Sequence, residues 1–381
     1  MATLVEDFPQ ELIDSIARYS GLTAEEALAF SRAHPHFRDS ITNWIPVHVH
    51  VTQGDAKLEL ASALSAHAPN PETVILDLDF RHDQYQEEAI QLLSEIQSLR
   101  HLALRQYPPE MQPTRDGRQN FFPYPAPLSS ELIQDSNLKN LTHLELSCLS
   151  IPFFMFKKLP RLTHLKLTMA RTHGYDYYDT LQYVDDARAC SMNMFEISLH
   201  THFATDRDEG RGLQIVEKCV KNWPELKVLN LISDSEGFTS KTCLNRPVLG
   251  PEFAVSCVKR LRKVAPKSLK LEQLSLGVVP TTRTGALIPL EGTPAHILNS
   301  VIEGPHSLPG LAEAFRSVCP TLRTFRCITP YNNPTCYRKY YEVARAVWTG
   351  KPGLWQCMRE KHGERPPMVF GKEWENSIVN W

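Results

Sequence analysis

The stretch NWPELKVLNL, residues 222–231, decides the fold class of this chain. Its leucines Leu226, Leu229 and Leu231 follow the spacing LxxLxL, and side chains two residues apart lie on the same face of a β-strand. A turn that contains a proline precedes them, and SVCPTLRTFRC, residues 317–327, repeats the arrangement in a degraded form. Each stretch therefore predicts a short strand with one face buried against a core.

The same spacing recurs along most of the chain. It is found at Leu141, Leu144 and Leu146; at Leu162, Leu165 and Leu167; at Met194, Ile197 and Leu199; and at Leu271, Leu274 and Leu276. Alternating or apolar runs predict earlier strands at Val47–Val51, Val74–Leu78 and Leu99–Leu104, with helices at Leu58–Leu64 and Glu87–Ile96 between them. A leucine strand joined by a helix to the next parallel strand resembles the leucine-rich repeat, in which each repeat needs its neighbours to bury its leucines.

The predicted fold class is α/β, with an irregular leucine-rich-repeat solenoid of parallel strands over residues 47–330. Segments rich in proline, glycine or tyrosine predict loop insertions near 107–128, 171–186 and 277–294. Residues 331–381 are expected to cap the open end of the array, and a helix is expected at Tyr337–Trp348. The alternative is an ordinary open α/β sheet with buried parallel strands.

The composition of the chain limits the kinds of partner and cellular compartment that we expect. The formal net charge is −2, and this balance gives no reason to expect nucleic acid as a partner. No apolar run approaches the ~20 residues that cross a bilayer, and the first residues are acidic, so we expect no membrane contact and a cytoplasmic and/or nuclear protein. Nine scattered cysteines without a CxxC pair predict reduced thiols rather than a disulfide framework.

No catalytic motif stands out, so we assign no catalytic residue, no metal and no cofactor, and expect no enzyme. Three histidines, His101, His143 and His164, occupy the same position ahead of a leucine and would form a ladder if their strands are adjacent. The most basic run, Lys259–Lys270, is interpreted as a solvated helix face.

Positions between the buried leucines should point away from the core and line a mixed-charge concave face. Such a face suits a protein ligand, which the sequence does not identify. The candidate substrate-binding residues are Asp77, Asp79, His101, Arg105, His143, Glu145, His164, Lys166, Glu196, His200, Asn230, Gln273 and Arg326.

Residues 5–46 carry more apolar side chains than three short helices can cover alone. The segment FPQELIDSIARYSGLTAEEALAFSRAHPHFRDSITNWIPV, residues 8–47, resembles an F-box, with Phe8 in the place of the commoner leucine. An F-box followed by degenerate leucine-rich repeats is similar to a class of proteins common in fungi.

The resemblance implies a three-helix F-box that docks on a Skp-family adaptor and, through it, on a cullin ubiquitin ligase, while the repeats hold the client protein. The residues implied in adaptor binding are Phe8, Pro9, Glu11, Leu12, Ile13, Ile16, Leu28, Phe30 and Phe37. Two alternatives stay open. The same side chains would serve as a cap for the first repeat, or the chain would be a protein-binding scaffold that has no connection to ubiquitination.

Overall fold

The structure is a computed structural model, and it describes residues 9, 12, 47–51, 56–67, 71–79, 83–107, 133, 136–148, 155–169, 176–199, 206–233, 251–277, 307–332 and 339–362. The chain divides into two compact units. The first comprises Met1–Leu162 with Met368–Trp381, and the second comprises Thr163–Pro367.

The first unit holds four parallel strands that pair in chain order. They are β1 (Val47–Val51), β2 (Thr73–Asp79), β3 (His101–Tyr107) and β4 (His143–Cys148). Helices α5 (Ala56–His67) and α6 (Asp83–Glu95) connect the first three strands, and the 3-10 helices η1 (Asn137–Asn140) and η2 (Phe156–Lys158) flank β4. The strands and helices expected over 47–104 are confirmed, with ends shifted by a few residues.

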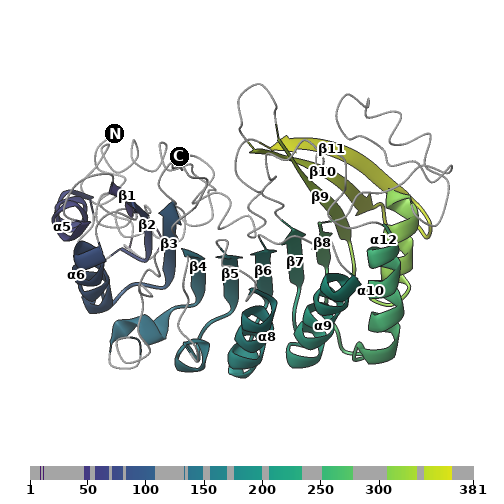
Figure 1. Cartoon of the computed structure of the whole chain (residues 1–381), viewed down its shortest axis with the longest axis horizontal. Coiled ribbons are helices and arrows are strands. Elements are labelled where there is room, and N and C mark those ends of the chain that lie inside the picture. The colour runs from purple at the N-terminus through teal and green to yellow at the C-terminus, as the bar shows by residue number, and fades with distance from the viewer. Residues whose placement is uncertain are drawn as a thin grey trace, which may run out of the picture. The chain divides into compact units, whose positions relative to one another are not determined.

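The second unit continues the same alternation of strand and helix (Figure 1). Its parallel strands are β5 (His164–Met169), β6 (Met194–Leu199), β7 (Val228–Ser233), β8 (Gln273–Leu276) and β9 (Thr324–Asn332). The connections contain α8 (Asp176–Asp186), the 3-10 helix η3 (Ala187–Ala189), α9 (Asp206–Asn222), α10 (Pro251–Val264) and α12 (Leu308–Arg316). Two antiparallel strands, β10 (Lys339–Trp348) and β11 (Trp355–His362), follow β9.

A row of buried side chains joins the strands of the second unit to its helices. Leu165, Phe195, Leu229, Leu274 and Phe325 are neighbours in register across β5–β9, and each is at most 1% exposed. The helices supply the other half of this core. Its aromatic contacts include the Phe315 ring of α12 against Phe325, with centroids 5.1 Å apart, and Trp223 against Phe195 at 5.2 Å.

The turns before the strands repeat the same backbone hydrogen bond, even though the connections between the strands differ in length. The N–H of Lys227 donates to the carbonyl of Asn193, that of Glu272 to Lys227, and that of Arg323 to Glu272, at 2.7–2.8 Å. In the first unit, the N–H of Thr142 donates to the carbonyl of Arg100 in the same way. Each strand therefore starts at a fixed level relative to the one before it, which is the repeat that the leucine spacing predicts.

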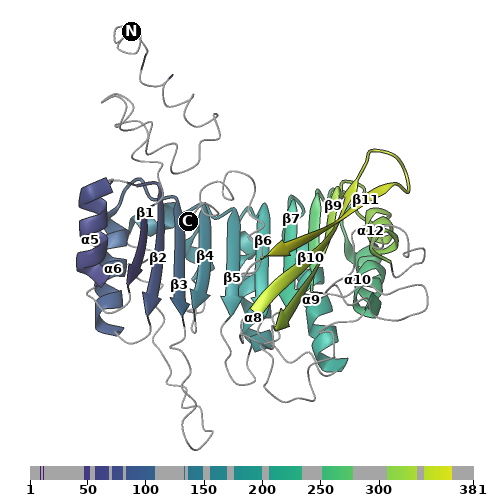
Figure 2. The ribbon, with the colours of Figure 1, turned by 90° about the horizontal axis from the view of Figure 1, so that it is seen from above.

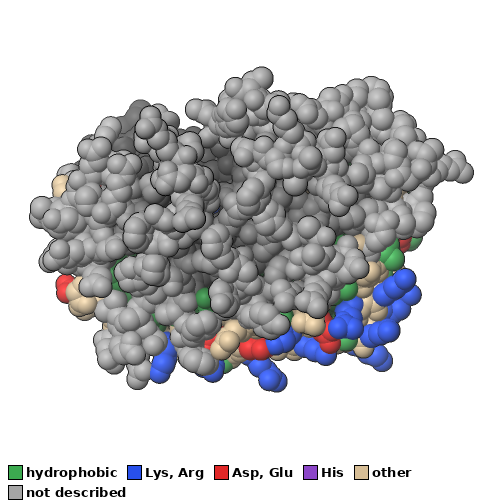
Figure 3. All heavy atoms as spheres, viewed as in Figure 1, with side chains coloured by type: hydrophobic (Ala, Val, Ile, Leu, Met, Phe, Trp, Pro, Cys, Tyr) green, Lys and Arg blue, Asp and Glu red, His purple; other side chains and the backbone are tan. Residues whose placement is uncertain are grey.

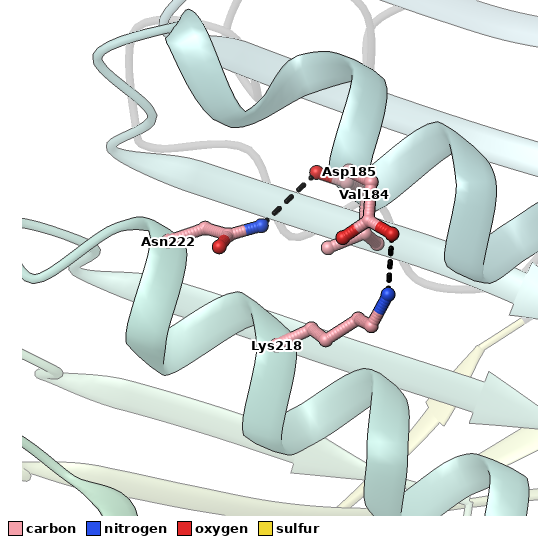
Figure 4. Close-up of polar contacts among 4 residues, drawn as sticks. All are labelled: Val184, Asp185, Lys218 and Asn222. Carbon is pink, nitrogen blue, oxygen red and sulfur yellow. Dashed lines mark hydrogen bonds and ion pairs between the residues drawn. The ribbon is translucent and has the colours of Figure 1, made fainter.

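Neighbouring helices of the second unit also contact each other. Figure 4 shows Lys218 of α9 paired with Asp185 of α8, and the side-chain amide of Asn222 donating to the carbonyl of Val184 at 3.3 Å. The indole N–H of Trp223 donates to the carbonyl of Ala187 at 3.2 Å. These contacts hold the end of α9 against the end of α8.

The sequence pattern predicts Leu76 of β2 and Ile197 of β6 as the counterparts of Leu102 and Leu229, and both predictions are wrong. Register pairs Val74, not Leu76, with Leu102, and it pairs Phe195, not Ile197, with Leu165 and Leu229. Each error is two residues along the strand, and a shift by two residues leaves side chains on the same face. The predicted core residues are therefore buried despite the shift.

The loop insertion expected near 171–186 is wrong where α8 forms. Tyr183, Val184 and Ala187 are buried along one side of α8 and η3. The other two expected insertions lie outside the described residues beyond Tyr107 and Gly277.

The helix expected at Tyr337–Trp348 is also wrong, because this segment forms β10. Ala344 and Ala346 are fully buried on either side of Arg345, which is the alternation of a strand. Pairing with β9 and β11 outweighs the helix preference of the alanines. Strand β9 also crosses the expected boundary at residue 330.

Residues 5–46 lie outside the described part of the chain except for Pro9 and Leu12. In the described ranges, no helix is both long and apolar enough to cross a bilayer.

A substitution at Gly212 of α9 would test how closely α9 packs against α10. A Cβ at this position would lie 3.0 and 3.1 Å from two ring carbons of Phe253, which is fully buried in α10. Alanine exceeds glycine in helix propensity by about 1 kcal/mol. Gly212→Ala should nevertheless lower the melting temperature, because overpacking a rigid core costs about 1–3 kcal/mol.

Thermal melts monitored by circular dichroism would measure this effect. In a Phe253→Leu background the ring is absent, so Gly212→Ala should be neutral or stabilising there. A higher melting temperature for Gly212→Ala alone would show that α9 and α10 do not pack as described.

Candidate functional site

The predicted binding residues whose side chains the structure describes lie on the strand face opposite the buried leucines. Asp77, Asp79 and Arg105 lie in β2 and β3, where Asp77 is the register neighbour of Arg105. Their side chains, and His200 as a whole, lie outside what the structure describes. Among the remaining candidates, His101 and His143 form a pair in the first unit, and Lys166, Glu196 and Asn230 belong to a polar row in the second.

His101 and His143 confirm one step of the expected ladder. They are register neighbours on β3 and β4, and their ring centroids lie 4.2 Å apart in an edge-to-face arrangement. A hydrogen bond joins Nδ1 of His101 to Oγ1 of Thr73 at 2.9 Å, and another joins Nδ1 of His143 to Oγ1 of Thr142 at 2.9 Å. These threonine contacts fix the orientation of both rings at the start of the strands.

His164 starts β5 in the second unit, where its Nδ1 is 2.8 Å from Oγ1 of Thr163. Burial is the main cause that lowers the pKa of His164 from 6.5 to about 4, and the positive charge of Lys227 lowers it further. The imidazole is therefore neutral at pH 7.

The second unit places a polar row across its parallel strands. Lys166, Glu196, Asn230 and Ser275 are register neighbours on β5, β6, β7 and β8. Nζ of Lys166 lies 3.5 Å from Oε1 of Glu196, and the side-chain amide of Asn230 donates to Oε2 of Glu196 at 2.9 Å. The row therefore links a cation, a carboxylate and an amide across three neighbouring strands.

The expectation that these positions form an exposed concave face is wrong for four of the candidates. Lys166 is 3% exposed, Glu145 is 3% exposed, and Glu196 and Asn230 are fully buried. Gln273 and Arg326 are half-buried. A charged pair without contact to water depends on the partners around it far more than a surface pair does.

Sequence reasoning missed two members of the same row. Ser275 stands between Leu274 and Leu276 and is fully buried, and Arg345 of β10 is the register neighbour of Arg326. Alternation along Ala344, Arg345 and Ala346 was the signal that could have identified the arginine. The serine could have been found because it holds the same place in its repeat as Asn230 does.

The basic run Lys259–Lys270 lies on the outer side of the helices of the second unit, where Figure 3 shows lysine and arginine side chains gathered. Arg260 pairs with Glu217 at 2.6 Å, and Lys270 pairs with Glu225 at 2.6 Å. Lys259, Arg262 and Lys263 are exposed. This surface faces away from the polar row.

The cysteine thiols that the structure describes are buried. Six are free and buried, and burial raises the pKa of the Cys357 thiol to about 11 and those of Cys190 and Cys319 to about 12. Among the residues that the structure describes, no group of three or more His, Cys, Asp or Glu side chains could hold a metal ion.

Of the residues implied in adaptor binding, the structure describes two. Pro9 and Leu12 are exposed, with Leu12 at 44%, and the N–H of Leu12 donates to the carbonyl of Pro9 at 2.9 Å. The others, Phe8, Glu11, Ile13, Ile16, Leu28, Phe30 and Phe37, lie outside the described residues.

The ion pair of Lys166 with Glu196 should be essential for stability. Lys166→Met should lower the free energy of unfolding by about 3–5 kcal/mol, because Glu196 would stay buried without its cation. Lys166→Met with Glu196→Gln should recover most of the loss, since glutamine still accepts from Asn230. Lys270→Met breaks an exposed pair, at 55% and 59% exposure, and should cost at most about 1 kcal/mol.

Urea denaturation of the three variants would compare these costs. Equal losses for Lys166→Met and Lys270→Met would contradict the burial of the first pair.

His164 should make stability depend on pH. Between pH 6.5 and about 4 the unfolded imidazole binds a proton that the folded one does not, so stability should fall as pH falls through this window. The full shift corresponds to about 3 kcal/mol at 1.36 kcal/mol for each pKa unit. Urea melts at pH 7 and pH 4.5 should show this loss in the wild type beyond that in His164→Gln, and identical losses would contradict it.

The comparisons with known proteins add little to this geometry. No family model and no curated protein matches the chain. Among solved structures, the leucine-rich repeat-containing protein LegL7 from Legionella pneumophila is 12% identical, with a TM-score of 0.33 over 74% of this chain and 83% of that chain. A PfkB family carbohydrate kinase from Listeria grayi is 11% identical, with a TM-score of 0.21 over 52% and 46% of the two chains. The repeated turns and strand register, rather than either likeness, give the chain a leucine-rich-repeat-like α/β fold.

Proposed function

We propose that this chain is a non-catalytic protein-binding repeat scaffold whose N-terminal segment is an F-box. In this proposal the repeats hold a client protein, and the F-box binds a Skp-family adaptor and, through it, a cullin ubiquitin ligase. The proposal places the protein in the cytoplasm and/or nucleus and assigns it no catalytic residue, metal or cofactor.

The observation that carries the scaffold proposal is the constant register of successive repeats. Strands β1–β4 in the first unit, and β5–β9 in the second, each pair with the next strand in chain order. Equivalent positions of each repeat therefore stand side by side and form continuous rows. Repeat proteins use such extended surfaces to bind other proteins.

The F-box part rests on the sequence resemblance and on the exposure of two apolar residues. Leu12 and Leu354 are the exposed large hydrophobic side chains of the described ranges, at 44% and 53%. Leu12 lies with Pro9 in the segment that resembles an adaptor-binding helix. An exposed leucine there is the kind of side chain that a partner buries at the centre of an interface.

Binding of a purified Skp-family adaptor to the full chain, measured by isothermal titration calorimetry, tests this proposal. The wild type should bind with a micromolar or lower Kd. Leu12→Asp should weaken binding roughly 30-fold, the loss expected when a central interface residue is removed. Leu354→Asp introduces the same change at the other exposed leucine and should leave adaptor binding unchanged.

Absence of adaptor binding by the wild type would defeat the F-box part. The chain would then remain a protein-binding scaffold without ubiquitin machinery, which is the alternative function. Equal losses in Leu12→Asp and Leu354→Asp would also defeat it, because the effect would not come from the proposed adaptor-binding segment.

A further inference from the structure

The most basic stretch of the chain comprises the end of α10 and the turn that follows it. Residues 259–270, KRLRKVAPKSLK, contain six lysines and arginines and no aspartate or glutamate, although the formal net charge of the whole chain is −2. Such a concentration of like charge creates a local positive potential whatever the net charge of the molecule. This stretch therefore has the charge of an interaction surface.

Helix α10 turns these cations toward water because its other side is part of the core. Phe253 and Leu261 on that side are at most 1% exposed. Three exposed cations lie on the opposite side of the helix and a fourth follows on the turn: Lys259, Arg262, Lys263 and Lys267. We call these four residues the basic face. Figure 3 shows lysine and arginine side chains gathered on this side of the second unit.

The carboxylates close to the basic face are already paired with other cations. Glu217 of α9 pairs with both Lys221 and Arg260, and Glu225 pairs with Lys270. Within the part of the chain that the structure describes, no ion pair joins a carboxylate to a residue of the basic face. The positive charge of this face is therefore not balanced by its surroundings.

The residues of the basic face also repel one another. Lys259 and Lys263 are four residues apart on one helix, a spacing at which like charges destabilise the helix. The C-terminal end of α10 attracts the cations of its last turn, but the helix dipole is equivalent to only about half an elementary charge there. Because this attraction offsets a small part of four positive charges, a partner with several carboxylates would relieve the repulsion.

A membrane surface fits the basic face poorly. Helices that lie on membranes combine their cations with apolar side chains that enter the bilayer. The exposed large hydrophobic side chains of the described ranges are Leu12 and Leu354, and neither belongs to α10 or to the turn after it. The basic face therefore offers charge without an apolar anchor.

A nucleic acid also fits less well than an acidic protein segment. Surfaces that bind single strands add aromatic side chains on which bases stack, but Phe253, the aromatic residue of 251–277, is fully buried. The carboxylates of Glu217 and Glu225 lie among the cations and oppose a continuous line of phosphates. A peptide carries its carboxylates on separate flexible side chains, which can avoid these two residues.

We propose that the basic face is a docking surface for a segment of another protein that is rich in aspartate and glutamate. The carboxylates of this segment accept hydrogen bonds from the guanidinium group of Arg262, whose planar fork suits a carboxylate, and from the ammonium groups of the three lysines. The surface faces away from the polar row and requires neither the F-box nor the adaptor.

Fluorescence anisotropy with the full chain and a fluorescein-labelled octaglutamate peptide tests this proposal. The wild type should bind the peptide with a micromolar Kd at an ionic strength of about 0.05 M, and binding should weaken at least about 5-fold at about 0.3 M, because salt screens exposed charges. An oligodeoxythymidylate of eight nucleotides should bind more weakly than the peptide. Vesicles of phosphatidylcholine with about one fifth phosphatidylserine should not sediment the protein.

A pair of double variants separates the basic face from the charge of the whole molecule. Lys259→Gln with Lys263→Gln should weaken peptide binding at least about 10-fold. The matched control, Lys139→Gln with Lys351→Gln, removes the same charge from two exposed lysines outside the basic face and should bind as the wild type does. Glutamine is a good helix former, so thermal melts should show that the first variant is at least as stable as the wild type.

Tighter binding of the peptide than of the other two probes, lost in the first variant and kept in the control, supports the proposal. The proposal is overturned if the peptide does not bind, or if the oligonucleotide or the vesicles bind more tightly. Equal losses in the two double variants also overturn it, because the effect would then reflect net charge. Adaptor binding enters none of these measurements, so their failure is distinct from a failure of the proposed F-box.

Discussion

The structure depends on the packing of one row of buried side chains against one layer of helices. Side chains alternate along a strand, so once Leu229 and Leu231 pack toward the helices, Asn230 between them must face the other way. Because the strands pair in parallel with a constant register, the equivalent residues of the neighbouring strands face the same way. The hydrogen bonds that lead from Asn193 through Lys227 to Glu272 keep β6, β7, β8 and β9 at the same level.

This constraint creates a second row that is polar and, in the second unit, buried. An open repeat sheet would leave that row in water, where Lys166 and Glu196 would gain little from each other. Strands β10 and β11 turn back over this face of the sheet (Figure 2). Lys166 and Glu196 are buried, and buried charges must pair.

The leucine spacing predicts the buried faces and the order of the strands, because burial of alternating side chains is a local pattern. It does not predict the antiparallel end, since Ala344 and Ala346 are good helix formers and only pairing with β9 and β11 makes them strand residues. The same contrast between a local sequence pattern and strand pairing applies to the candidate site. Asn230 and Arg326 could be placed on the polar face from the sequence, whereas the pairing of Arg326 with Arg345 depends on β10, which the sequence predicted as a helix. The adaptor-binding residues remain predictions except for the exposure of Pro9 and Leu12.

Hydrogen exchange of the backbone amides tests the central claim most directly, because it reports which strands open together. In the wild type, the amides of β6, β7 and β8 should exchange far more slowly than those of the exposed turn at 349–354. Leu229→Ala should raise exchange in all three strands together, because the buried row that passes through Leu229 joins them to the helices. Faster exchange confined to β7, or strands that exchange as fast as the turn in the wild type, would contradict a core that is shared from repeat to repeat.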